Sequence, residues 1–140
     1  MTEIDIKITK KLLQDYQKTK REIPILEYEL QEMKTSDTGM GNDTIFDYRD
    51  GYPKPQSVVG FDWPLYEHRQ EVLERKKAQA KAVEQWINTI EDGQTRCVFR
   101  MRYIDDMSWV KIGLKTGYGG NHDYPRRHIR DRFLEKKGIK

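Results

Sequence analysis

The chain has 140 residues, of which 36% are hydrophobic and 35% charged, with a formal net charge of +3 and a mean hydropathy of −0.94. This length suits one domain of ordinary size, but the low apolar content leaves little core beyond paired helices. A single cysteine excludes an internal disulfide. There is neither a signal peptide nor an apolar run of membrane-spanning length, so we expect a cytoplasmic protein that does not contact a membrane.

Residues 1–34 form the first segment, and we expect a helix from about residue 4. Seven side chains recur at alternating spacings of four and three, which is the pattern of a coiled-coil seam. They are Leu12, Tyr16, Thr19, Ile23, Leu26, Leu30 and Met33. Pro24 removes a backbone donor, so we expect a kink or two helices meeting near Ile23. The seam fits two interpretations equally well: an intrachain helix pair, or a self-association segment that makes a homodimer.

Residues 35–61 differ in composition and predict an irregular loop or linker. Turn-forming residues dominate its first part, and Pro53 and Pro55 follow Asp50 and Gly51. The carboxylates of this segment lack the alternating ligand spacing of a calcium-binding loop, so we expect no metal there. We expect its aromatic side chains to dock onto helices rather than to stack on bases.

A second long helix is predicted over residues 62–92, with Asp62 as its N-cap and Pro64 in its first turn. Its seam has the same alternating spacing as the first. The seam contains Val72, Lys76, Gln79, Val83, Trp86 and Ile90, with Leu73, Ala80 and Ile87 alongside. The two seams are nearly equal in length, so they could cover each other within one chain. Glu91–Gly93 should end the helix, and Asp92 can cap the next one.

Residues 93–140 predict two short helices, a glycine-rich turn and a basic helix. The first helix, within 95–104, has one apolar face, formed by Cys97, Val98, Met101 and Ile104. Ser108 is a good N-cap for the second, which should bury Trp109, Ile112 and Leu114 and end at Gly117. After the turn 117–121, Asn121 or Asp123 can cap the basic helix 124–137. This helix offers Ile129, Phe133 and Leu134 to a core.

The charge of the chain is divided unevenly along the sequence. Residues 96–140 hold twelve Lys and Arg against five Asp and Glu, a net +7, while residues 1–95 hold fourteen against eighteen, a net −4. A basic helix can neutralise phosphates and release their counterions, and its arginines can reach guanine edges in a major groove. A solvated charged face is the alternative. The spacing of the helices favours DNA binding.

The run from Arg96 to Tyr118 resembles region 4 of sigma-70-type factors, in which a helix ending in Arg-Tyr precedes an acidic turn and a Ser-Trp helix start. It is most similar to variants carried by phages and prophages of Gram-positive bacteria, the late-gene activators of the ArpU and RinA type. The motif Gly119–Asn121 followed by Arg126, and the ending 132–134, are also similar to that group. Pro125 departs from the β-branched or small residue common there. The resemblance implies the function class of transcription regulation, but not the promoter. We expect double-stranded DNA as the partner in a host bacterial cytoplasm, and RNA polymerase is left open as a further partner.

We therefore predict an all-α protein, with an N-terminal helical hairpin or coiled-coil part joined to a C-terminal sigma region 4-like helix-turn-helix. Its predicted function is that of a sequence-specific DNA-binding phage transcriptional regulator. The candidate DNA-binding residues are Asn121, His122, Asp123, Tyr124, Arg126, Arg127, Arg130, Lys111 and Lys115. Arg126 and Arg130 lie one turn apart and are expected to contact bases, whereas Arg127 is expected to contact a phosphate. Lys111 and Lys115 would meet the DNA backbone.

Two other functions remain open. One is a small terminase subunit that recognises DNA for packaging, and the other is a sigma-like module that binds RNA polymerase or another protein without reading DNA. We find no spacing of nucleophile, base and orienting residue that supports catalysis, and the three histidines are too scattered for a metal site. The protein is accordingly expected not to be an enzyme, and to need no cofactor and no metal.

Overall fold

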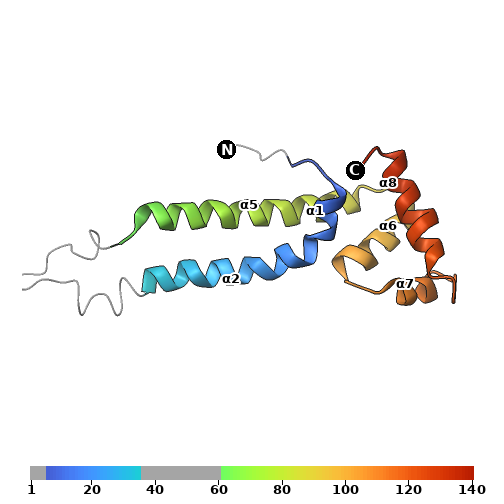
Figure 1. Cartoon of the computed structure of the whole chain (residues 1–140), viewed down its shortest axis with the longest axis horizontal. Coiled ribbons are helices and arrows are strands. Elements are labelled where there is room, and N and C mark those ends of the chain that lie inside the picture. Colours follow the sequence, from blue (N-terminus) through green and yellow to red (C-terminus); the bar gives the residue numbers. More distant parts are fainter. Residues whose placement is uncertain (1–5, 36–60) are drawn as a thin grey trace, which may run out of the picture. The chain divides into compact units, whose positions relative to one another are not determined.

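The computed structural model describes residues 6–35 and 61–140, and these two ranges form helices without a β-strand. The described part is therefore all-α, as predicted. The expected irregular segment 35–61 lies outside the described residues except for its two ends. The N-terminal helix was expected from about residue 4, but residues 6–9 are not helical and the first helix begins at Lys10, after the Thr9 cap. The helices are α1 (Lys10–Gln14), α2 (Tyr16–Thr35), α5 (Trp63–Asn88), α6 (Gly93–Phe99), η2 (Arg100–Ile104), α7 (Trp109–Lys115), η3 (Tyr124–Asp131) and α8 (Arg132–Lys136) (Figure 1). The segments η2 and η3 are π-helical, which means that their hydrogen bonds span five residues rather than four.

The described residues divide into two compact units. One unit combines residues 6–20 with 77–140, and the other combines residues 21–35 with 61–76. Both long helices contribute to both units, because α2 passes from the first to the second and α5 returns.

In the second unit, α2 and α5 run antiparallel. Glu22 forms an ion pair with Lys76 at 3.3 Å, and the ammonium of Lys34 lies 5.6 Å from the ring centre of Tyr66. Residues further along α2 therefore meet residues earlier in α5. Of the expected α2 seam, Leu30 is buried and Ile23, Leu26 and Met33 are half-buried. The rings of Phe61, Trp63 and Tyr66 pack together at the start of α5.

The helix break expected near Ile23 lies elsewhere. Helix α2 continues through Pro24, which is exposed, so water can satisfy the carbonyl that the proline leaves without a donor. The break lies at Asp15, which ends α1 and whose backbone leaves helical geometry at φ −85° and ψ 1°. The Thr9 side chain caps α1 by accepting a hydrogen bond from the Leu12 N–H at 3.1 Å.

The first unit buries the other half of both seams. In α2, Tyr16 and Thr19 are 4% exposed, and the Tyr16 hydroxyl donates a hydrogen bond to Glu84 of α5. The buried positions of α5 in this unit match the expected main seam only in part, because Val83 is buried as expected but Ala80 and Ile87 are buried in place of Gln79 and Trp86, which are half-buried. Ile90, which follows the end of α5, is also buried, and in the second unit Leu73 is buried while Val72 is half-buried. Residues that were predicted to flank the seam of α5 are thus buried, while the longer side chains of Gln79 and Trp86 remain partly exposed.

The helices after α5 share one core. It consists of Val98, Met101, Ile112 and Ile129, with Cys97, Met107, Trp109 and Tyr118 packed around it. The ring of Phe99 contacts Trp86 at a centroid distance of 5.5 Å and Phe133 at 5.4 Å, which joins α5, α6 and α8. The buried Phe99 was missed by the apolar-face prediction. Leu114 was wrongly placed in the core, since it is 64% exposed.

Three predicted helix caps are confirmed. Asp62 accepts a hydrogen bond from the Leu65 N–H at 3.0 Å, and Asp92 accepts from the Thr95 N–H at 2.9 Å. Ser108 accepts from the Lys111 N–H at 3.2 Å. Each side chain satisfies a backbone donor that has no partner within its helix. Local chemistry therefore determines where α5, α6 and α7 begin.

Candidate nucleic-acid interface

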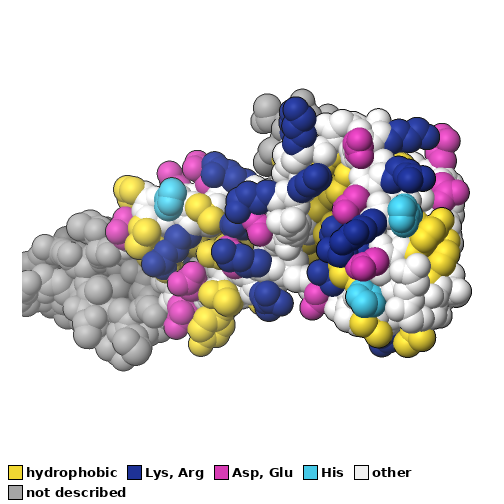
Figure 2. Space-filling model, turned by 45° about the vertical axis from the view of Figure 1, so that its right-hand side comes forward, with side chains coloured by type: hydrophobic (Ala, Val, Ile, Leu, Met, Phe, Trp, Pro, Cys, Tyr) yellow, Lys and Arg dark blue, Asp and Glu magenta, His cyan; other side chains and the backbone are white. Residues whose placement is uncertain are grey.

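Basic side chains lie over the C-terminal helices as well as over the long helices, and acidic side chains and histidine are interspersed with them (Figure 2). This part of the molecule carries the net charge of +7 found in residues 96–140. The surface is mixed rather than uniformly basic. The position and exposure of each side chain must therefore decide which cations are available to a ligand.

The turn between α7 and η3 brings the two helices close together. A Cβ atom on Gly113 would lie 3.2 Å from the Gly119 carbonyl oxygen and 3.3 Å from the His122 Cα. The backbone of the turn therefore approaches α7 so closely at Gly113 that a residue without a side chain is favoured. Gly117 and Gly119 adopt the left-handed φ values of 89° and 55°. The Tyr118 and Gly119 N–H groups both donate to the Gly113 carbonyl, at 2.9 and 3.1 Å. The turn is thereby fixed to α7.

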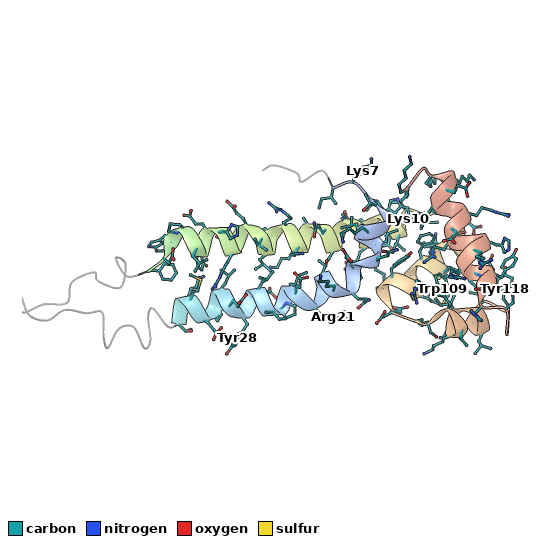
Figure 3. All side chains as sticks on the ribbon, in the orientation of Figure 1. Lys7, Lys10, Arg21, Tyr28, Trp109 and Tyr118 are labelled. Carbon is teal, nitrogen blue, oxygen red and sulfur yellow. The ribbon has the colours of Figure 1, made fainter. Side chains whose placement is uncertain are left out.

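Aromatic stacking holds the same turn against η3. The Tyr118 ring stacks on Tyr124 at a centroid distance of 4.2 Å, and Tyr124 lies 4.9 Å from the His128 ring. The Gln94 amide of α6 donates to the Tyr118 hydroxyl at 3.1 Å. Figure 3 labels Tyr118 in this turn and Trp109 at the first position of α7. The start of η3 therefore packs on the turn, and the turn is itself hydrogen-bonded to α6 and α7.

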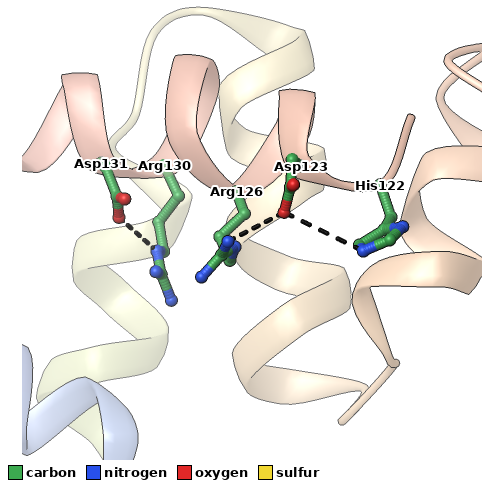
Figure 4. A network of polar contacts seen from close by, with 5 residues as sticks. All are labelled: His122, Asp123, Arg126, Arg130 and Asp131. Carbon is green, nitrogen blue, oxygen red and sulfur yellow. Dashed lines mark hydrogen bonds and ion pairs between the residues drawn. The ribbon is translucent and has the colours of Figure 1, made fainter.

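The first residues of η3 form a polar network (Figure 4). Asp123 occupies the N-cap position, but its carboxylate accepts a hydrogen bond from Arg126 at 2.8 Å instead of capping the backbone. The His122 Nε2 lies 3.9 Å from the same carboxylate. The hydrogen bond from Arg126 lowers the pKa of Asp123 below its ordinary value. The expected side-chain cap by Asn121 or Asp123 is replaced: the Asn121 carbonyl accepts the Tyr124 N–H at 3.3 Å.

Arg130 is held by partners from three other residues. Its Nε donates to Asp131 at 2.9 Å, its Nη1 donates to the Tyr103 hydroxyl at 3.5 Å, and its guanidinium lies 4.9 Å from the Trp109 ring centre. Arg102 lies at the same distance from that ring. The Arg130 side chain is only 18% exposed. Burial raises the pKa of Tyr103, and the nearby Arg130 charge opposes that rise.

The structure separates the candidate residues by accessibility. Asn121, His122, Tyr124, Arg127, Lys111 and Lys115 are exposed, and Asp123 and Arg126 are half-buried. Arg126 and Arg130 point to the same side of η3, as Figure 4 shows. Arg127 is the arginine of η3 whose exposure leaves it available to a ligand, and the exposed His128 follows it.

A groove lined by residues of α6, of η2 and of the end of α7 adds basic residues that were not among the candidates from the sequence. Its lining includes Arg96, Arg100 and Lys115, together with Cys97 and Met101. The Arg96 Nη1 also donates to the Ile90 carbonyl at 2.9 Å, which ties α6 to the end of α5. The four-residue spacing of Arg96 and Arg100 off the apolar face was visible in the sequence. Their meeting with Lys115 required the tertiary structure.

Within the two described ranges, no group of three or more His, Cys, Asp or Glu side chains is placed to hold a metal ion. No helix in these ranges is long and apolar enough to cross a bilayer. Comparisons with protein-family models, curated proteins and solved structures gave no match.

Proposed function

We propose that this protein is a sequence-specific DNA-binding regulator that reads double-stranded DNA through a helix-turn-helix formed by α7, the glycine turn and η3. The observation that carries the proposal is the start of η3. There, exposed Asn121, His122, Arg127 and His128 project from a segment held by α7, by the turn and by the shared core. A basic helix end that is rigidly supported can present polar groups to base edges without a large ordering cost.

Phosphate binding would come from α6 and α7. Lys111 and Lys115 are exposed one turn apart on α7, and Lys115 shares its groove with Arg96 and Arg100. Such cations release counterions from DNA and orient the protein, while η3 supplies base contacts. Arg126 would contact a base by exchanging its hydrogen bond to Asp123 for a hydrogen bond to the base edge.

The resemblance to sigma-70 region 4 supports a role in transcription, of the kind carried out by phage late-gene activators in a host bacterial cytoplasm. RNA polymerase is then the natural protein partner. The proposed architecture is a helical pair, α2 with α5, joined to the helix-turn-helix.

Selection of genomic DNA fragments by the purified full chain tests this proposal. We expect enrichment of one short motif close to a promoter. Enrichment at a packaging site would instead support the small terminase subunit. Uniform retention of all fragments would contradict sequence-specific reading and leave only an electrostatic surface.

A protein-docking function is the second candidate, because two apolar side chains on α7 face solvent. Val110 is 55% exposed and Leu114 is 64% exposed, one helical turn apart. A Val110→Ser, Leu114→Ser double variant should lose RNA polymerase in a pull-down while keeping its DNA affinity. Polymerase binding by the unmodified chain without any DNA preference would favour docking alone.

A further inference from the structure

Helix α2 has a second, outward stripe in addition to the seam that meets α5. Arg21, Ile25, Tyr28 and Glu32 follow one another at spacings of four, three and four residues, so they share one side of the helix. All four are exposed, with Ile25 at 59% and Tyr28 at 65%. Figure 3 shows Arg21 and Tyr28 on the side of α2 away from α5.

The apolar centre of this outer stripe is unusual for a solvent-facing helix side. Ile25 and Tyr28 are two of the large hydrophobic side chains that face solvent in the described residues, and the exposed Pro24 lies beside them. The inner seam does not need them, because Leu30 and its neighbours already face α5. Adjacent apolar groups left in water are characteristic of a docking surface.

The ends of the stripe carry opposite charges, and this polarity identifies what can cover it. Arg21 stands at one end and Glu32 at the other, with the apolar pair between them. Two copies laid antiparallel would place each Arg21 against the other copy's Glu32 and each Ile25 against the other copy's Tyr28. A parallel arrangement would oppose like charges at both ends. The surface is thus complementary to itself under a two-fold rotation, which is the requirement for a closed dimer.

We propose that the outer stripe of α2, Arg21, Ile25, Tyr28 and Glu32, binds the same stripe of a second copy of this chain in antiparallel orientation. This interface differs from the inner seam of α2, which is occupied by α5 of the same chain. It does not depend on DNA binding, so the proposed function could fail while the dimer stands.

Light scattering of the purified full chain at tens of micromolar tests the dimer directly, because it should give twice the chain mass of 16.7 kDa. Arg21→Glu would set two carboxylates against each other at both ends, and Glu32→Arg would do the same with two guanidinium groups. Each single variant should dimerise at least about tenfold more weakly than the original chain. Circular dichroism should be unchanged, since both side chains are exposed.

Charge exchange gives the decisive comparison. A mixture of the Arg21→Glu chain with the Glu32→Arg chain should form a heterodimer, and the double variant should dimerise by itself. The control variant is Arg75→Glu, which reverses an exposed charge on α5 and should leave the dimer mass in light scattering unchanged. A monomeric original chain would overturn the proposal. So would a dimer that survives both reversals and Ile25→Asp, because another surface would then hold it.

Discussion

Arg127 and Arg130 lie three residues apart in η3 but have different surroundings. Arg127 is exposed, whereas Arg130 contacts Asp131, the Tyr103 hydroxyl and the Trp109 ring. A guanidinium that already has partners must give them up before it can bind a base. The structure therefore favours Arg127 for ligand contact and Arg130 for holding η3 against η2 and α7.

We expect Arg127→Ala to weaken DNA binding by about 1–3 kcal/mol with little change in thermal stability. Arg130→Ala should instead lower the free energy of unfolding by about 1–3 kcal/mol, because Tyr103 and Asp131 lose a charged partner. Thermal denaturation and DNA titration of both variants measure the two effects, with exposed Arg132→Ala as the control. If Arg130→Ala keeps its stability but loses DNA affinity, Arg130 reads DNA directly.

Gly113 tests the close approach between α7 and the turn. Alanine would gain up to about 1 kcal/mol of helix propensity, but its Cβ would press on backbone atoms of Gly119 and His122. Overpacking of this kind costs about 1–3 kcal/mol, so we expect Gly113→Ala to lower the melting temperature and displace the start of η3. Gly120→Ala is the matched control, since nothing lies within 4 Å of its added Cβ. Equal melting temperatures for both variants would contradict this tight contact.

Helix α2 keeps a proline in its interior at a cost in stability. Proline in a helix interior is about 3 kcal/mol less favourable than alanine, and exposed Pro24 shows no burial that would offset this. Pro24→Ala should therefore raise the free energy of unfolding by about 1–3 kcal/mol, as measured by urea denaturation. A decrease would show that the proline ring makes a contact that stabilises the folded state.

The first unit brings both ends of the described chain together. The Gln17 amide of α2 donates to the carbonyls of Tyr103 and Ile104 at 2.7 and 2.8 Å, and the Lys10 N–H donates to the Lys140 carbonyl at 3.1 Å. Helix α1 and the first turn of α2 thus pack with η2 and with the C-terminal end of the chain. Buried Tyr103 lies at this junction.

The stability of this junction should depend on alkaline pH. Burial raises the pKa of Tyr103 above its ordinary value of 10.0, so the unfolded chain loses the phenolic proton first as pH increases. The contribution of Tyr103 to the free energy of unfolding is then constant below about pH 9 and falls above pH 10, by up to about 1.4 kcal/mol per pH unit. Urea denaturation between pH 8 and 11 measures the slope, which should be smaller in Tyr103→Phe. An unchanged slope in that variant would assign the effect to other groups.

Local patterns in the sequence determined the helices of the described residues and several of their boundaries. The caps Asp62, Asp92 and Ser108 were predictable because each side chain bonds to a backbone group three residues away.

The α2 seam was predictable from its spacing, but whether a second chain or α5 covers it depends on contacts far apart in sequence. The same limit explains Pro24, whose exposure allows the helix to continue, and Leu114, which has the right spacing for a core residue but is exposed. The tertiary structure alone likewise decided which basic side chains remain accessible. Asp123 accepts a hydrogen bond from Arg126, and the guanidinium of Arg130 contacts Tyr103 and Trp109.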